Sequence, residues 1–142
     1  MSLVRWKDEY LTQVEEIDSQ HRRLIDLING IYDLMRVGRD QESIAEALGE
    51  VVDYTRFHFQ TEEKFMAETS YQGVVGHSAE HERLLDQGRE LRRSLQDGRI
   101  VVSMNEMYFL KDWLINHIQG PDRGLAAHLM ARALPYIEDA AI

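Results

Sequence analysis

The stretch IAEALGEVVDYTRFHFQTEEKF, residues 44–65, decides the fold of this chain. Its core positions recur at alternating steps of four and three residues, which is the repeat of a helix packed along the seam of a bundle. Those positions are Ile44, Leu48, Val51, Thr55, His58, Glu62 and Phe65. Two of them are polar, because His58 and Glu62 lie one helical turn apart on the face that points into the core.

Helix-forming segments fill most of the remaining chain, and turns rich in Gly and Pro separate them. The helices are predicted over residues 19–37, 41–68, 77–96 and 102–118, with a short fifth helix over 123–134. Asp18 or Ser19 is suited to cap the start of the first helix, and Asp40 the start of the second. Pro135 is expected to stop the fifth helix.

The connections between these helices are short, so consecutive helices should run antiparallel. We therefore expect an all-α fold, an antiparallel up-down-up-down four-helix bundle, in a single domain over residues 1–142. Residues 1–17 form an N-terminal arm, and its apolar side chains should pack on the bundle.

The inward stripe of each long helix carries histidine near one of its ends. His21 opens the first stripe, His77 and His81 open the third, and His117 closes the fourth. In an antiparallel bundle, the starts of the first and third helices lie beside the ends of the second and fourth. The topology therefore gathers these histidines with His58 and Glu62 at one end of the molecule.

A single histidine in a core is usually a hydrogen-bonded packing residue. Five inward histidines cannot satisfy one another cheaply, whereas neutral imidazoles are good ligands for zinc, copper, iron and nickel. Five imidazoles and a carboxylate are too many for one structural zinc with its roughly four ligands, so a pair of metal ions fits better. Glu62 is the first candidate to bridge the pair. Asp122 is the second, although an aspartate there is also suited to cap the fifth helix.

Two other kinds of metal site fit the sequence less well. The stretch HSAEH, residues 77–81, matches a zinc-protease motif, but that site needs a distant further ligand and a substrate cleft. We expect Glu80 to point sideways from the face of the two histidines. Ferritin-like di-iron oxidases use paired Glu-x-x-His motifs, and no such motif occurs in this sequence.

Four segments together resemble hemerythrin, and in particular the bacterial single-domain hemerythrins: IDSQHRRL (17–24), HFQTEEKFM (58–66), HSAEH (77–81) and LKDWLINHIQGPD (110–122). The likeness extends over nearly the whole chain and implies a non-haem di-iron site. It implies that one iron is bound by His77, His81 and His117 and the other by His21 and His58. Glu62, Asp122 and an oxo or hydroxo group would bridge the two irons.

With about six positions on each iron, this ligand set leaves one position open, on the iron with two histidines. The resemblance implies that O2 binds there reversibly, for oxygen transport, storage or delivery. A dry pocket would limit proton delivery, and we expect Ile25 and Leu114 to line its wall. The alternatives are a sensor of O2, redox state or iron that acts through a partner protein, and a di-iron peroxidase or nitric oxide reductase. The sequence offers no extra acid or base for an enzyme near the open position.

The composition is compatible with this interpretation. A net charge of −9 argues against nucleic acid or an anionic membrane as a partner. The absence of cysteine excludes thiolate metal sites and iron–sulfur clusters. No secretory signal or transmembrane-length apolar run is visible, so we expect a cytoplasmic monomer with O2 as its ligand. The sixth histidine, His128, follows all the ligand positions and is expected to be a packing or surface residue.

Overall fold

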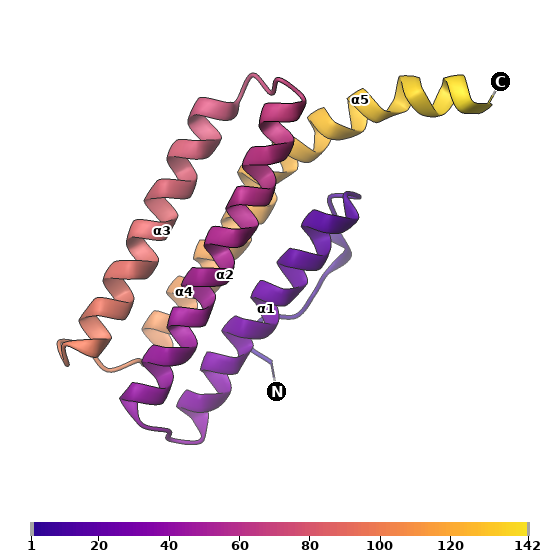
Figure 1. Ribbon diagram of the computed structural model, residues 1–142. Coiled ribbons are helices and arrows are strands. Elements are labelled where there is room, and N and C mark those ends of the chain that lie inside the picture. Colours follow the sequence, from indigo (N-terminus) through magenta and orange to yellow (C-terminus); the bar gives the residue numbers. More distant parts are fainter. Residues whose placement is uncertain (1, 142) are drawn as a thin grey trace.

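The computed structural model describes the backbone of residues 2–141 and the side chains of residues 2–132. Four long helices run alternately up and down (Figure 1): α1 (Glu15–Arg36), α2 (Gln41–Glu68), α3 (Val74–Gln96) and α4 (Met104–His117). The described backbone contains no strand. The predicted all-α antiparallel bundle is therefore confirmed, and the bounds predicted for α2 are the observed ones.

The chain continues from α4 through a π-helical turn, η2 (Ile118–Asp122), into α5 (Arg123–Ala141). The prediction that Pro135 stops this last helix is wrong, because α5 continues past it. A proline keeps a helical φ, but it removes one backbone hydrogen bond and its ring crowds the carbonyl four residues earlier, so a helix passes through it only at a cost.

The helix α1 begins one turn earlier than predicted, and Asp18 lies inside its first turn rather than at its cap. The buried Asp18 carboxylate accepts hydrogen bonds from the Thr12 N–H at 2.9 Å, the Thr12 hydroxyl at 2.7 Å and the Gln13 N–H at 3.2 Å. It thus ties the arm to α1, beside a Gln13 with a φ of 67°. The second predicted cap is confirmed, since Asp40 Oδ2 accepts from the Ser43 N–H at 3.1 Å.

The N-terminal arm packs on α1, as its apolar residues predicted. A short 3-10 turn, η1 (Asp8–Tyr10), buries the ring of Tyr10, and Val4 is also buried. The amide of Asn29 bonds both backbone groups of Val4, at 2.9 and 2.8 Å. The Arg22 guanidinium lies 4.4 Å from the centre of the Trp6 ring. These contacts cover the outer face of α1 between Arg22 and Asn29.

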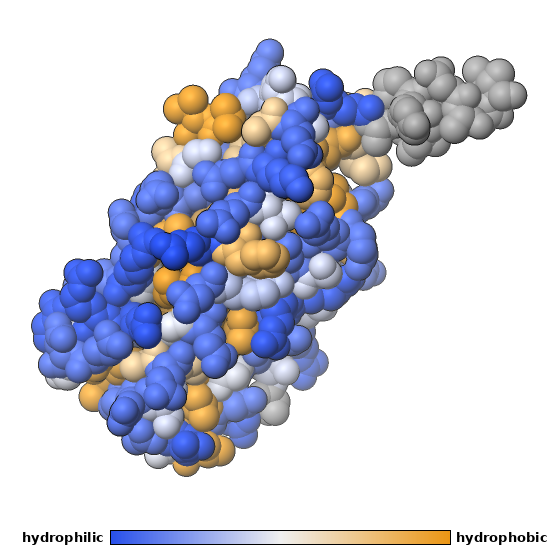
Figure 2. Space-filling model, viewed as in Figure 1, coloured by the Kyte–Doolittle hydropathy of each residue, from blue (hydrophilic) through white to orange (hydrophobic). Residues whose placement is uncertain are grey.

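The outer surface is mostly hydrophilic, with small separate apolar patches on the face drawn in Figure 2. No helix in the described part of the chain is long and apolar enough to cross a membrane. The apolar side chains instead fill the space between the four helices, where Ile28, Leu48, Met107 and Leu110 are among the fully buried residues.

Candidate metal centre

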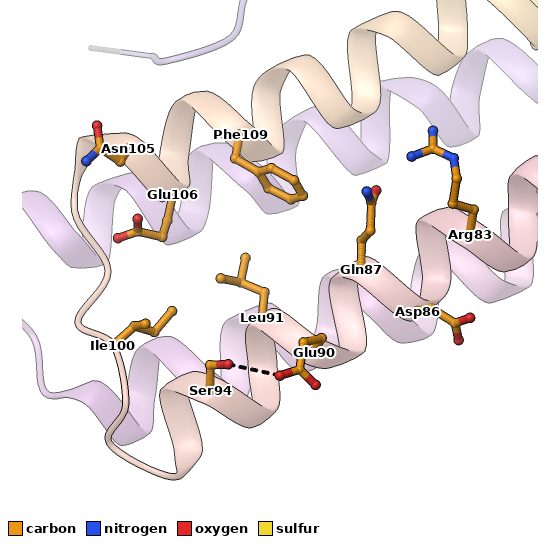
Figure 3. A pocket seen from close by; sticks show the side chains of 10 residues that line it. All are labelled: Arg83, Asp86, Gln87, Glu90, Leu91, Ser94, Ile100, Asn105, Glu106 and Phe109. Atoms are coloured by element: carbon orange, nitrogen blue, oxygen red, sulfur yellow. Dashed lines mark hydrogen bonds between the residues drawn. The ribbon is translucent and has the colours of Figure 1, made fainter.

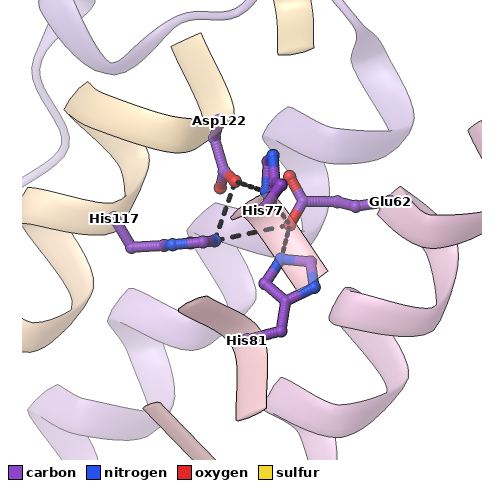
Figure 4. A group of neighbouring side chains, drawn as sticks. All are labelled: Glu62, His77, His81, His117 and Asp122. Carbon is purple, nitrogen blue, oxygen red and sulfur yellow. Dashed lines mark hydrogen bonds and ion pairs between the residues drawn. The ribbon is translucent and has the colours of Figure 1, made fainter. Parts of the chain in front are cut away.

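Seven polar side chains meet at the end of the bundle where α1 and α3 begin and α2 and α4 end. All are at most 5% exposed: His21, His58, Glu62, His77, His81, His117 and Asp122. Figure 4 shows five of them, with three imidazoles directed at the carboxylates of Glu62 and Asp122. The structure thus brings together every residue that the sequence suggested as a metal ligand.

The carboxylate of Asp122 lies between two groups of histidines. Its Oδ1 atom is 3.1 Å from His77 Nε2 and 2.8 Å from His117 Nε2. Its Oδ2 atom is 2.7 Å from His21 Nε2 and 3.6 Å from His58 Nε2. One oxygen therefore faces each histidine group, which is the arrangement that a bridging carboxylate needs. Both oxygens contact imidazoles instead of capping the start of α5.

The carboxylate of Glu62 also reaches both groups. Its Oε1 atom lies 3.1 Å from His81 Nε2, 3.5 Å from His117 Nε2 and 3.3 Å from His58 Nε2. Its Oε2 atom is buried and has no hydrogen-bond partner among the described residues. A buried carboxylate oxygen without a donor is costly, so this atom indicates a further positive partner at the site.

The π-helical turn explains how Asp122 reaches the site. In an α-helix, the residue five positions after His117 would point about 140° away from it. In a π-helix the hydrogen bonds join residues five apart, so the same step returns to nearly the same face. The segment that contains Gly120 and Pro121 adopts this turn, and it aligns the carboxylate of Asp122 with the imidazole of His117.

The charges of the two carboxylates dominate the electrostatics of the cluster. Burial lowers the pKa of His58, but Glu62 and Asp122 outweigh it and raise the pKa to about 9. For His117 the same competition, with Asp122 as the larger contributor, raises the pKa to about 10. At His81 the effect of burial is the larger one, so its pKa is lowered. Its ring stacks on Phe59, with ring centroids 3.7 Å apart.

The carboxylates are held in their charged form in return. Burial raises the pKa of Asp122, but His117, His21 and His58 outweigh it and hold the value well below the ordinary range. The pKa of Glu62 is also lowered, because His58 and His117 outweigh its burial and the repulsion from Asp122. The centre is therefore a compact set of anionic oxygens surrounded by imidazoles.

The donor atoms fit a pair of metal ions. Atoms of Glu62, Asp122 and three histidines lie within 4.8 Å of one another, and so do atoms of the same two carboxylates and the other two histidines. The ring atoms His21 Nε2 and His58 Nε2 face each other at 3.1 Å, although two neutral ring nitrogens can share only one proton. Imidazole and carboxylate are both suitable ligands for iron, and the shared carboxylates leave room for one ion in each group.

A small apolar cavity adjoins the two groups. Its free volume of about 10 Å³ is near the lower limit for the centre of one water-sized molecule. Leu114 lines it, whereas the buried Ile25 does not, and Leu24 lies there instead. The full lining is Leu24, Thr55, His58, Phe59, Leu84, Trp113, Leu114 and His117.

The two polar side chains of this lining that are not candidate ligands already donate hydrogen bonds to backbone carbonyls. The Thr55 hydroxyl donates to the Val51 carbonyl at 2.7 Å. The Trp113 indole N–H donates to the Leu84 carbonyl at 3.1 Å. Within the described lining, the cavity therefore offers a bound molecule no free proton donor outside the cluster.

Three polar residues near the cluster have other roles. Glu80 forms an ion pair with Arg83 on the surface of α3, so it points sideways, as expected, and the protease interpretation fails. Glu63 is half-exposed, and its carboxylate lies 3.9 Å from His81 Nδ1. His128 lies outside both donor groups, and its Nε2 atom is 3.2 Å from the Thr69 carbonyl, where it joins α5 to the end of α2.

A larger groove of about 680 Å³ lies on the surface between α3 and α4 (Figure 3). Its apolar floor includes Leu91, Ile100 and Phe109, and none of the seven cluster residues lines it. The carboxylate of Glu90 is already engaged by Arg93 and Arg99, at 3.1 and 3.3 Å. The candidate ligands all lie outside this groove, so the buried cluster remains the candidate site.

Sequence reasoning missed the buried Gln20, whose amide contacts the cluster. No spacing rule identifies it, because a glutamine beside His21 looks like an ordinary helix residue.

Fold and site together define a four-helix metal protein whose histidine–carboxylate cluster fits a non-haem di-iron site. The family model of the hemerythrin HHE cation binding domain matches residues 12–129, and the chain belongs to the hemerythrin family. It is 34% identical to a bacteriohemerythrin of Stenotrophomonas maltophilia over 92% of this chain and 84% of that protein. It is 36% identical to a bacteriohemerythrin of Pseudomonas aeruginosa over 87% of this chain and 80% of that protein. A solved structure of wild-type hemerythrin superposes with a TM-score of 0.83 at 29% identity and covers 90% of this chain and 98% of that one.

Proposed function

We propose that this chain binds O2 reversibly at a pair of non-haem iron ions, for oxygen transport, storage or delivery. One iron would be held by His77, His81 and His117, and the other by His21 and His58. Glu62 and Asp122 would bridge the pair. The observation that carries the proposal is that both donor groups share these two carboxylates.

When bound, the two irons would supply the two electrons and the open coordination position that reversible O2 binding requires. The chain's own residues would do the rest. Leu24, Leu84 and Leu114 exclude water from the cavity, and one histidine of each group, His58 and His117, lies at its edge. The ligand count would leave the open position on the iron held by His21 and His58.

The lack of a free proton donor in the described cavity lining, outside the proposed ligands, supports O2 binding without turnover. A peroxidase or a reductase has to deliver protons to its bound molecule, and a positioned acid or base usually does this. In the described lining the ionisable groups are His58 and His117, both proposed as ligands. Thr55 and Trp113 already donate hydrogen bonds to backbone carbonyls. We therefore propose a carrier or store, and no contact described here favours the enzyme or the sensor.

Iron content in a pair of matched variants tests the proposed ligand set. Glu62→Gln and Glu63→Gln make the same change at adjacent positions, one buried in the cluster and one half-exposed outside it. We expect wild type and Glu63→Gln to bind two irons per chain, and Glu62→Gln to bind fewer. Equal iron content in all three proteins would mean that Glu62 does not bridge the irons, and the proposal would then lose its basis.

A further inference from the structure

Gln20 connects the two ligand-bearing helices α1 and α2 through its side-chain amide. It lies on α1 beside His21 and is 5% exposed. Its Oε1 atom is 2.7 Å from His58 Nδ1, on α2. Its Nε2 atom donates to the Thr61 hydroxyl at 3.1 Å, and Thr61 directly precedes Glu62.

The hydrogen bonds fix the orientation of this amide. The Thr61 hydroxyl donates to the Phe57 carbonyl at 3.3 Å, so its oxygen is left to accept from another group. The NH2 group of Gln20 donates to that oxygen, which turns the amide carbonyl toward the imidazole of His58. A carbonyl oxygen can only accept, so Nδ1 of His58 must carry the proton.

The proton on Nδ1 determines what His58 presents to the centre. When Nδ1 carries the proton, the lone pair of the neutral ring lies on Nε2, the atom that faces the carboxylates. The other four histidines of the cluster differ, because Nδ1 of His21, His77, His81 and His117 has no hydrogen-bond partner among the described residues. Among the five, His58 is the one whose tautomer is held by a buried side chain.

We infer that Gln20 is a positioning residue that presets His58 as a ligand through its Nε2 atom and so sets the affinity of the two-histidine metal position. This inference rests on the proposed ligand set. A partner on the far nitrogen of a metal-binding imidazole fixes the ring and raises its basicity, and its loss typically weakens metal binding by about 10- to 100-fold. Gln20 should therefore affect one of the two metal positions and leave the other unchanged.

The test is a Co²⁺ titration of the metal-free protein, followed by the cobalt absorption bands, in wild type and three variants. Gln20→Leu removes the acceptor, and we expect it to weaken one of two Co²⁺ equivalents by about 10- to 100-fold. Gln20→Glu keeps an oxygen that accepts from the Nδ1–H of His58, so it should restore the affinity for that Co²⁺ equivalent. Gln60→Leu makes the same change on the exposed face of α2 and should bind like wild type.

A second readout follows the proton itself. In the zinc-loaded protein, the Nδ1–H of His58 should exchange slowly with water in wild type and quickly in Gln20→Leu, as measured by NMR. A purely structural role would not move this signal selectively. The inference on Gln20 is overturned if Gln20→Leu binds both Co²⁺ equivalents like wild type, or weakens both equally. If wild type itself binds fewer than two equivalents, the proposed function fails instead.

Discussion

Metal uptake should release protons from the cluster, and the number released can be worked out from the structure. In the metal-free chain, Glu62 and Asp122 raise the pKa of His58 to about 9 and that of His117 to about 10. Both imidazoles are then charged below those values. A metal ion needs the bare ring nitrogen, so it has to displace a proton from each.

The free-energy cost of releasing these protons follows from the difference between each pKa and the pH of the measurement. At about pH 7.5 the two groups lie roughly 1.5 and 2.5 pH units below their pKa values, so removing both protons costs on the order of 5 kcal/mol. At least about two protons should leave when both positions fill, since the pKa of His77 is raised as well. The apparent affinity for the pair should rise by about 100-fold per pH unit below pH 9 and level off above pH 10.

Isothermal titration of the metal-free protein with Zn²⁺, in two buffers of different ionisation enthalpy, counts the protons directly. His128→Gln is the matched control, because His128 lies outside both donor groups and its loss should leave the proton count unchanged. A count near zero at about pH 7.5, or an affinity independent of pH between about 6.5 and 8.5, would refute the reasoning on the charged imidazoles.

Three further predictions concern the site and the fold. His58→Ala should weaken the two-histidine metal position and abolish reversible O2 binding; a variant that keeps the full O2-dependent spectrum would show that His58 is not a ligand. Leu114→Ser places a hydroxyl, which can serve as a proton donor, at the cavity, and its O2-dependent spectrum should decay at least about tenfold faster than that of Leu114→Ala, which removes the same bulk without a donor. Ser103→Ala breaks the capping box of α4 and should lower the free energy of unfolding by about 1 kcal/mol in urea titrations, with no change in metal content; an unchanged midpoint would mean that this cap contributes nothing.

The bundle and its centre could be predicted because both depend on helical spacing. The four-three repeat of α2 gave the direction of the core, and it put His58 and Glu62 on the same inward face. Antiparallel topology then brought helix ends together without any knowledge of distances. Ligands on regular helices are therefore visible in a sequence even when they are far apart along the chain.

The features that sequence reasoning missed depend on local departures from that regularity or on single contacts. The observed start of α1 lies one turn before the predicted one, because Asp18 bonds the arm instead of capping the helix. The geometry at Asp122 depends on a π-helical turn, which no propensity scale distinguishes from a loop that contains Gly and Pro. Spacing also could not choose between Leu24 and Ile25 for the cavity, since adjacent residues on one helix face differ only in how the neighbouring helices pack.

The most direct test of the central claim is the visible spectrum of the iron-loaded protein through repeated cycles of O2 and argon. The protein should be reduced anaerobically, and iron should be counted per chain. The account predicts two irons per chain and an absorption band that appears in O2, disappears under argon and returns in the next cycle with little loss. Immediate conversion to a stable oxidised spectrum, with no band that argon reverses, would contradict reversible O2 binding at this site.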